Sequence, residues 1–214
     1  GLTALRKQIN PSSAMGKSAV TVNSEAAAAD ATARGVQLLK ESKETKLELV
    51  DCSIGVSGAK ALAKALREND VLTDLNLDGN KFGPDGAKAI AEALKDHTSL
   101  TSFSLGANGI GPKGAKAIAK ALKENRTVKT LALRGNNIGM EGARAIAETL
   151  DDENNQLVNV RLGGNSIPHE GMKMIAMTLR KNRPILKVVD QWLLPVVAVV
   201  VGWLLKCAIK RLWA

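Results

Sequence analysis

Apolar and polar positions alternate in five short segments that recur at a nearly fixed distance along the chain. This alternation is the period-two pattern of a half-buried β-strand. The apolar pairs are Leu47/Leu49, Leu75/Leu77, Phe103/Leu105, Leu131/Leu133 and Val160/Leu162. A turn position follows each pair, at Cys52, Asn80, Asn108, Asn136 and Asn165, with steps of 28, 28, 28 and 29 residues. A repeat of this length predicts a solenoid.

The second part of each unit has the spacing of an α-helix. In the third unit Ala115, Ile118 and Leu122 fall on one helical face, and the alanines between them predict close contact with neighbouring helices. The glycines that we expect to open the helices are Gly58, Gly86, Gly114, Gly142 and Gly171. The asparagines that we expect to end helices in the left-handed conformation are Asn69, Asn125 and Asn182.

The repeated phrase can be written L-x-L-x-x-N-x-I-G-x-x-G-A-K-A-I-A-x-A-L. It resembles leucine-rich repeats of the ribonuclease-inhibitor type, the class also found in NOD-like receptors and in Ran GTPase-activating proteins. The resemblance covers residues 45–182. It implies an α/β fold, a right-handed solenoid of about five strand-turn-helix repeats, with parallel strands on the concave side. Such a repeat specifies a fold and says little about function.

The N-terminal region has a different composition from the repeats. Residues 1–24 carry Arg6, Lys7 and Lys17 as their only charges, which fits either the end of an organelle-targeting segment or a disordered or partner-bound arm. Residues 25–44 include an alanine-rich run, which predicts a capping helix of a first repeat without a strand. The chain starts at Gly1 and not at Met, so we expect that it is either processed or numbered from a trimmed start. This start and the shortage of acidic residues favour a mitochondrion or plastid.

The C-terminal region, residues 185–214, is much more apolar than the repeats. As a helix, the 22 residues from Trp192 to Trp213 would be roughly 32 Å long, close to the hydrocarbon thickness of a bilayer. The residues expected to anchor it are Trp192, Leu193, Leu194, Val197, Val200, Trp203, Leu204 and Trp213. A helix buried in a partner protein, or folded back on the open end of the solenoid, is also compatible. Basic residues flank both ends, so the orientation is undetermined.

The net charge of +9 is compatible with nucleic acid, an anionic membrane or an acidic protein as partner. The lysines on the predicted helices are Lys88, Lys95, Lys113, Lys116, Lys120 and Lys123. We expect them to form a solvated convex face. Nucleic acid is not expected, because the charged faces of the repeats offer no aromatic side chains for stacking.

The outward strand positions predict the concave surface. They are Glu48, Asn76, Ser104, Ala132 and Arg161, flanked by Val50, Asp78, Gly106, Arg134 and Gly163. Small side chains of mixed charge predict a weak or electrostatic contact, because tight interfaces favour large aromatic and arginine anchors. From these sets, the expected contact residues are Glu48, Asn76, Asp78, Arg134 and Arg161.

No motif predicts catalysis, a cofactor, a metal or a small-molecule substrate. The sequence Gly16-Lys17-Ser18 lacks the first glycine of a phosphate-binding loop, where Pro11 stands, and a preceding strand. His97 and His169 are the only histidines and have no ligands at metal-binding spacing. No nucleophile stands in a recognisable elbow.

Two functions are compatible with these patterns. The first is a non-enzymatic scaffold or accessory subunit of a membrane protein complex, for example an organellar energy-converting complex. Its C-terminal helix would be the anchor, and its repeats would bind neighbouring subunits. The alternative is a soluble regulatory protein-binding module whose C-terminal helix docks into a partner protein. Both functions predict protein partners. The first also predicts association with a membrane, in which the orientation of the chain is unknown.

Overall fold

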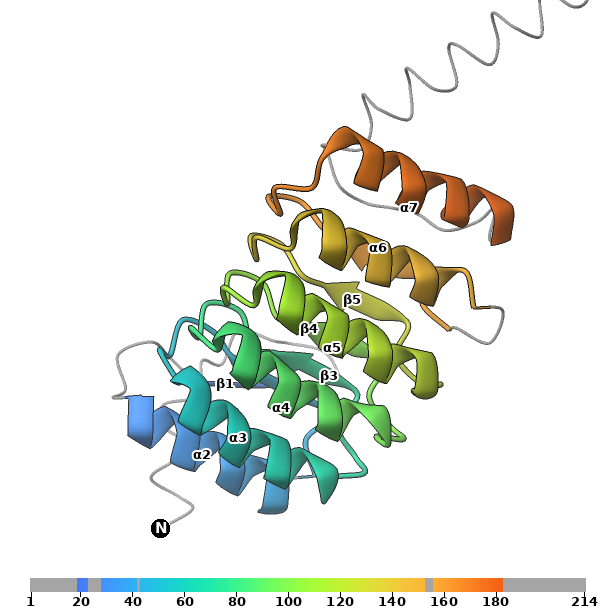
Figure 1. Cartoon of the computed structure of the whole chain (residues 1–214). Coiled ribbons are helices and arrows are strands. Elements are labelled where there is room, and N and C mark those ends of the chain that lie inside the picture. Colours follow the sequence, from blue (N-terminus) through green and yellow to red (C-terminus); the bar gives the residue numbers. More distant parts are fainter. Residues whose placement is uncertain (1–18, 23–27, 42, 153–155, 183–214) are drawn as a thin grey trace, which may run out of the picture.

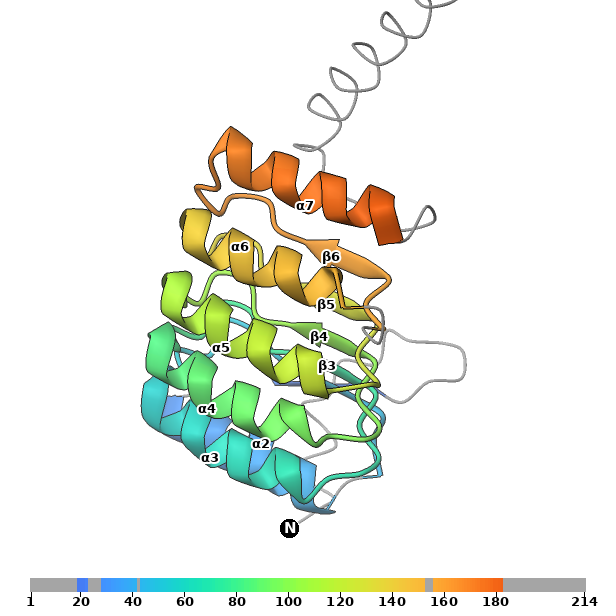
Figure 2. The same cartoon turned by 45° about the vertical axis from the view of Figure 1, so that its right-hand side comes forward.

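A computed structural model describes residues 19–22, 28–41, 43–152 and 156–182. These residues form two layers, a parallel sheet and a row of helices packed over one of its faces (Figures 1 and 2). The strands are β1 (Ala19–Val22), β2 (Lys46–Leu49), β3 (Asp74–Asn76), β4 (Ser102–Ser104), β5 (Thr130–Ala132) and β6 (Asn159–Arg161). The helices are α2 (Ala28–Glu41), α3 (Gly55–Arg67), α4 (Gly83–Lys95), α5 (Gly111–Glu124), α6 (Gly139–Leu150) and α7 (His169–Asn182). The predicted α/β repeat architecture is confirmed.

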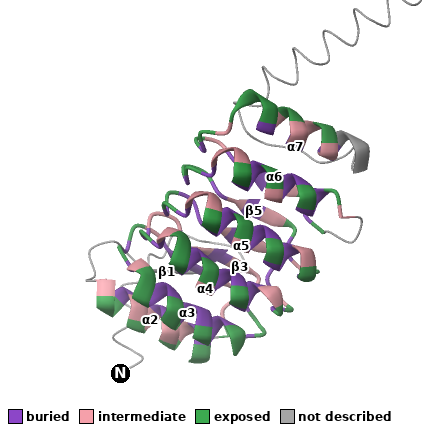
Figure 3. Ribbon diagram, in the orientation of Figure 1, coloured by how far each residue is buried: buried purple, intermediate pink, exposed green. Residues whose placement is uncertain are grey.

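Equivalent residues of successive repeats lie side by side in the sheet. Leu75 of β3 pairs with Phe103 of β4, and Phe103 pairs with Leu131 of β5. These inward residues are buried between the layers, while their strand neighbours are half-buried on the other face. Figure 3 shows exposed residues on the outer sides of the helices and buried residues where the helices meet the rest of the stack. The predicted alternation of the strands is therefore confirmed.

The first repeat is not strandless, so that expectation was wrong. Residues Ala19–Val22 form β1, which pairs in parallel with β2 in the register Val20 to Leu47 and Val22 to Leu49. This strand lies within residues 1–24, which were predicted to be the end of an organelle-targeting segment or a disordered or partner-bound arm. The signal in the sequence was weak, because Val20 stands 27 residues before Leu47 and lacks the full phrase that follows the later strands.

The predicted helix starts were three residues too late in α3 to α6. These helices begin at Gly55, Gly83, Gly111 and Gly139, which have positive φ angles. Each donates its N–H to the turn asparagine carbonyl of the next repeat, as Gly83 does to Asn108 at 2.9 Å. The later glycines instead permit close helix packing. A Cβ atom added to Gly114 would lie 2.9 Å from the Cβ of Ala87 on the preceding helix.

Asn69 and Asn125 act through their side chains and not through a left-handed backbone, contrary to the prediction, and the side chain of Asn182 lies outside the described residues. Asn125 has φ −72°. Its Oδ1 accepts the N–H groups of Thr127 and Val128, both at 2.9 Å, and its Nδ2 donates to the carbonyl of Leu94 at 2.7 Å. Asn69 makes the equivalent bonds one step earlier in the stack. These asparagines therefore fasten each turn to the preceding repeat.

The turn asparagines form a second ladder between successive repeats. Asn108 Oδ1 accepts the N–H of Asn80 at 3.0 Å, and Asn108 Nδ2 donates to the carbonyl of Leu77 at 2.8 Å. At the N-terminal end of this ladder stands Cys52, whose N–H donates to Asn80 Oδ1 at 3.1 Å. Burial and the nearby carboxylate of Asp51 raise the pKa of the Cys52 thiol. This cysteine is a structural side chain of the core.

In the described chain, the last unit departs from the pattern of the helix-starting glycines. Gly139 of α6 donates its N–H to the carbonyl of Asn165 at 3.0 Å. The equivalent residue of the next unit is Pro168, which has no backbone N–H to donate. This row of hydrogen bonds therefore cannot continue from α7 to a further repeat.

Among the described residues, no helix is both long enough and apolar enough to cross a bilayer. The predicted anchor, residues 185–214, lies outside the described residues and stays a prediction. The same holds for residues 1–18 and for the Gly-Lys-Ser sequence within them.

Candidate functional site

The face of the sheet turned away from the helices is the candidate site, and we call it the strand face. It comprises Lys46, Glu48, Val50, Asp74, Asn76, Asp78, Ser102, Ser104, Gly106, Thr130, Ala132, Arg134, Asn159, Arg161 and Gly163. The five residues predicted to contact a partner all lie on it. Their role in binding stays a prediction.

The central row of the strand face crosses five strands in register. Glu48 pairs with Asn76, Asn76 with Ser104, Ser104 with Ala132, and Ala132 with Arg161. Neighbouring strands lie about 4.8 Å apart, so the row extends roughly 19 Å from β2 to β6. The side chains in this row are half-buried, so each strand contributes one partly exposed group.

Acidic side chains gather at the β2–β3 end, which we call the acidic end. It contains Lys46, Glu48, Asp51, Asp74 and Asp78, so four negative charges and one positive charge give a net charge of −3. Lys46 Nζ lies 4.0 Å from Asp74 Oδ1, and both side chains are partly exposed. A pair at this distance and exposure contributes little to stability and leaves the end negative.

The carboxylate of Asp78 has a fixed position at the acidic end. Its Oδ1 accepts a hydrogen bond from the Ser104 hydroxyl at 2.6 Å and another from the backbone N–H of Gly106. A Cβ atom added to Gly106 would lie 3.1 Å from this carboxylate, so the glycine gives Asp78 its close approach to β4. Asp78 is therefore oriented by the neighbouring repeat.

Basic side chains gather at the β5–β6 end, which we call the basic end. It contains Arg134 and Arg161 of the strand face and Lys129, which directly precedes β5 and is not part of that face, a net charge of +3. Lys129 and Arg134 are exposed, and Arg161 is half-buried. Within the described part of the chain, Arg161 forms no ion pair, and its buried Nε and the buried Oδ1 of Asn159 have no hydrogen-bond partner. This end thus combines positive charge with unsatisfied polar atoms.

Small and uncharged side chains occupy the middle of the strand face. They are Ser102, Ser104, Gly106, Thr130 and Ala132. The chain has no tyrosine, its two phenylalanines are buried in the core, and its three tryptophans lie outside the described residues. The strand face itself therefore offers no aromatic anchor.

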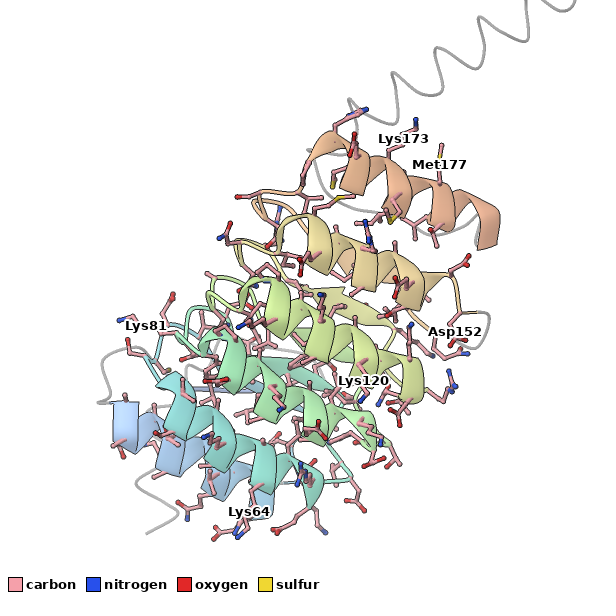
Figure 4. The ribbon with its side chains drawn as sticks, viewed as in Figure 1. Lys64, Lys81, Lys120, Asp152, Lys173 and Met177 are labelled. Carbon is pink, nitrogen blue, oxygen red and sulfur yellow. The ribbon has the colours of Figure 1, made fainter. Side chains whose placement is uncertain are left out.

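The lysines of the convex helix face are partly neutralised by carboxylates of neighbouring helices. Lys95 lies 2.8 Å from Glu124, Lys116 lies 2.9 Å from Glu141, and Lys123 lies 3.8 Å from Glu148. The hydrogen bond to Glu124 raises the pKa of Lys95, and the bond from Lys116 lowers the pKa of Glu141. Lys120 and Lys173 project outward from their helices in Figure 4. This exposed helix surface has the features of a solvated face.

Residues able to perform chemistry do not converge in the described part of the chain. No group of three His, Cys, Asp or Glu residues there is placed to hold a metal ion. A cavity of about 10 Å³, lined in part by Glu44 and Asn69, has room for about one water molecule. The two histidines lie far apart in the stack, His97 buried after α4 and His169 exposed at the start of α7.

His97 has a structural role that the sequence reasoning missed. Its Nδ1 accepts the backbone N–H groups of Ser99 and Leu100 at 3.4 and 3.2 Å, and its carbonyl accepts Asn125 Nδ2 at 3.0 Å. His97 therefore takes the place of an asparagine in the helix-end ladder. The signal was present, because His97 follows Leu94 by three residues, as Asn125 follows Leu122.

A model of a known protein family matches four segments of the chain, and each segment contains one strand and most of the helix that follows it. The family model described as "Leucine Rich repeat" matches residues 45–63, 68–91, 96–119 and 124–147. The chain carries leucine-rich repeats. Assignment of these leucine-rich repeats to the ribonuclease-inhibitor type remains a prediction. None of the curated proteins matches the chain.

Solved structures with similar folds include the following two. One is titled Leiomodin-1 Actin-Binding Site 2, with 24% identity, a TM-score of 0.60, and coverage of 71% of this chain and 88% of that one. Another is the C-terminal domain of tropomodulin from Caenorhabditis elegans, with 14% identity, a TM-score of 0.57, and coverage of 72% and 93%. At these identities the similarity establishes the fold.

Proposed function

We propose that the repeats form a non-enzymatic protein-binding module and that the strand face is its binding surface. The observation that carries this proposal is the row from Glu48 to Arg161, which presents one partly exposed side chain per strand between two ends of opposite charge. Leucine-rich repeats are frames on which surface residues determine the partner. The two asparagine ladders hold this frame rigid, so the exposed side chains are positioned before a partner binds.

Actin is the first partner that we propose to test. The support is limited to one similar fold, because the solved structure of leiomodin-1 is titled as an actin-binding site. A basic end carrying Arg134 and Arg161 offers charged contacts to an acidic surface of such a partner. The proposed contact is electrostatic, so the affinity should decrease as the salt concentration rises.

The predicted subunit of an organelle-membrane complex rests on residues outside the described part of the chain. Its basis is the apolar sequence from Trp192 to Trp213, which also fits a helix that docks into a partner protein. The protein-binding module needs no membrane, so we propose it as the better-supported function. Alkaline extraction of membranes, with the full chain beside a chain ending at Asn182, separates the two roles of the tail.

The experiment for the strand face is sedimentation of the full chain with actin filaments, together with a binding titration on actin monomers. The variant Arg134→Glu/Arg161→Glu should weaken binding at least about tenfold, because it reverses both arginines of the basic end. The matched control, Lys88→Glu/Lys120→Glu, reverses two lysines of the convex helix face and should change binding less than twofold.

Each other result has a definite meaning. If neither form of actin binds, actin is excluded as the partner. If actin binds and only the helix-face variant weakens it, the strand face is not the binding surface. Circular dichroism and thermal unfolding of both variants verify folding, and Arg134→Gln/Arg161→Gln provides a milder form of the same change.

A further inference from the structure

We propose that the strand face selects a protein segment with a defined order of charges. The segment places a lysine or arginine over β2–β3, an aspartate or glutamate over β5–β6, and a large apolar side chain between them. This inference rests on the proposed function and specifies the chemistry of the partner. It is drawn from the separation of charge along the row and from the small residues at its centre.

The acidic end defines the basic group of the partner. Its net charge of −3 comes from side chains on adjacent strands and on the turn after β2. Asp78 is held by the Ser104 hydroxyl and the Gly106 N–H, so its orientation is set before binding. A lysine or arginine of the partner therefore meets a negative surface whose carboxylate is already positioned.

The basic end defines the acidic group of the partner. Arg161 forms no ion pair with another described residue, and Lys129 also has none within the described part of the chain. A carboxylate over β5–β6 would meet Arg161, and arginine suits a carboxylate because its guanidinium group can donate two parallel hydrogen bonds.

The middle of the row defines the apolar group of the partner. Ser104 and Ala132 are small and adjacent across β4 and β5, and Ser102 and Thr130 beside them are short. Because energetic anchors at interfaces are large aromatic residues and arginines, and this middle has none, the partner must supply the large side chain. The short residues beneath it leave room for that side chain.

The geometry of the sheet sets the spacing of these groups. From β3 to β6 there are three strand spacings of about 4.8 Å, or roughly 14 Å, and from β2 to β6 there are roughly 19 Å. An extended segment rises about 3.3 Å per residue, so its opposite charges should be about four to six residues apart. When bound in the same chain direction, a segment with the reverse charge order would place like charges together at both ends, and this repulsion gives selectivity.

The test is selection from a phage-displayed library of random 12-residue peptides on the full chain of 214 residues. A parallel selection uses the full chain carrying Arg134→Glu/Arg161→Glu. On the unchanged chain, we expect enriched peptides with opposite charges four to six residues apart and an aromatic residue between them. Synthetic copies should bind at least about tenfold more tightly than the same peptides with the two charges exchanged.

The outcomes separate this inference from the proposed function. If enriched peptides bind and Arg134→Glu/Arg161→Glu removes binding, but no charge order is found, the charge-order inference is wrong and the strand-face function stands. If enriched peptides bind equally to the unchanged chain and to that variant, both proposals fail. If the full chain itself forms dimers that Arg134→Glu/Arg161→Glu dissociates, the occupant is a second copy, and the inferred partner segment is rejected.

Discussion

Asn80 donates its backbone N–H to the side-chain oxygen of Asn108, 3.0 Å away on the next repeat. The same Asn108 side chain donates to the carbonyl of Leu77, at 2.8 Å, and to that of Gly106, at 2.9 Å. One buried amide thus satisfies backbone groups of two repeats. This relationship recurs along the turn side of the stack and is one of the two asparagine ladders that connect successive repeats.

Replacing Asn108 by alanine should therefore destabilise the whole stack. The change leaves two buried N–H groups, those of Asn80 and Phe82, and two buried carbonyls without this partner, and we expect a loss of about 2–4 kcal/mol in the free energy of unfolding. Urea unfolding followed by circular dichroism measures it. Asn76→Ala is the matched control, because Asn76 is half-buried and accepts a single backbone bond, from Asp78. If both variants lose the same free energy of unfolding, the turn-asparagine ladder stabilises the fold no more than the single hydrogen bond of Asn76 does.

The contact between helices at Gly114 gives a second prediction. A Cβ atom there would lie 2.9 Å from the Cβ of Ala87 and 2.8 Å from the Cβ of Ile110. Although alanine favours helices over glycine, we expect Gly114→Ala to destabilise the fold by about 1–3 kcal/mol through overpacking. Adding Ala87→Gly should recover part of the loss in a double-mutant cycle. A more stable Gly114→Ala variant would contradict this packing.

The repeats could be predicted from the sequence because each unit repeats the same apolar spacing and the same turn asparagine. The strand β1 was missed, since only Val20 and Val22 represent the phrase there. The role of Gly114 was misjudged because spacing alone cannot separate a helix start from a close helix contact. The strand-face residues were found, since their outward positions follow from alternation. The fixed position of Asp78 could not be foreseen, because it depends on Ser104 and Gly106 one repeat away.

The buried His97 predicts a pH dependence of stability. Burial lowers the pKa of His97, although Asp70 raises it in part, and its Nδ1 accepts two backbone N–H groups. Since the unfolded chain binds this proton more readily, stability is retained above the ordinary histidine pKa and is lost as the pH falls below about 6.5. Thermal unfolding at pH 7.5 and pH 5.5 measures the loss.

The variant His97→Asn tests that explanation, because asparagine occupies the same rung at Asn69 and Asn125 and does not titrate. The decrease in melting temperature between the two pH values should be smaller in His97→Asn than in the unchanged chain. His169→Asn is the control, since His169 is exposed, and it should leave the decrease unchanged. An identical decrease in all three chains would show that His97 does not contribute.

The thiol of Cys52 should react slowly with thiol reagents in the folded protein. It is buried, and burial together with Asp51 raises its pKa, so little reactive thiolate is available. In a Cys207→Ser background, labelling with an aromatic disulfide reagent should be at least about tenfold slower in buffer than in urea. Equal rates in the two solvents would place Cys52 at an open surface.

The most direct test of the strand face is an exchange of its two ends. The variant changes Glu48 and Asp74 to lysine, and Lys129, Arg134 and Arg161 to glutamate. The acidic end then changes from −3 to +1, and the basic end from +3 to −3. These five side chains are exposed or half-buried, and Asp78 is left unchanged because it bonds to β4.

The measurement is the affinity of the selected peptides and of their charge-exchanged copies for the full chain and for this variant. We expect the preferred charge order to reverse, with each chain binding its matching order at least about tenfold more tightly. An unchanged preference, in a variant that circular dichroism shows to be folded, would contradict recognition by the strand face.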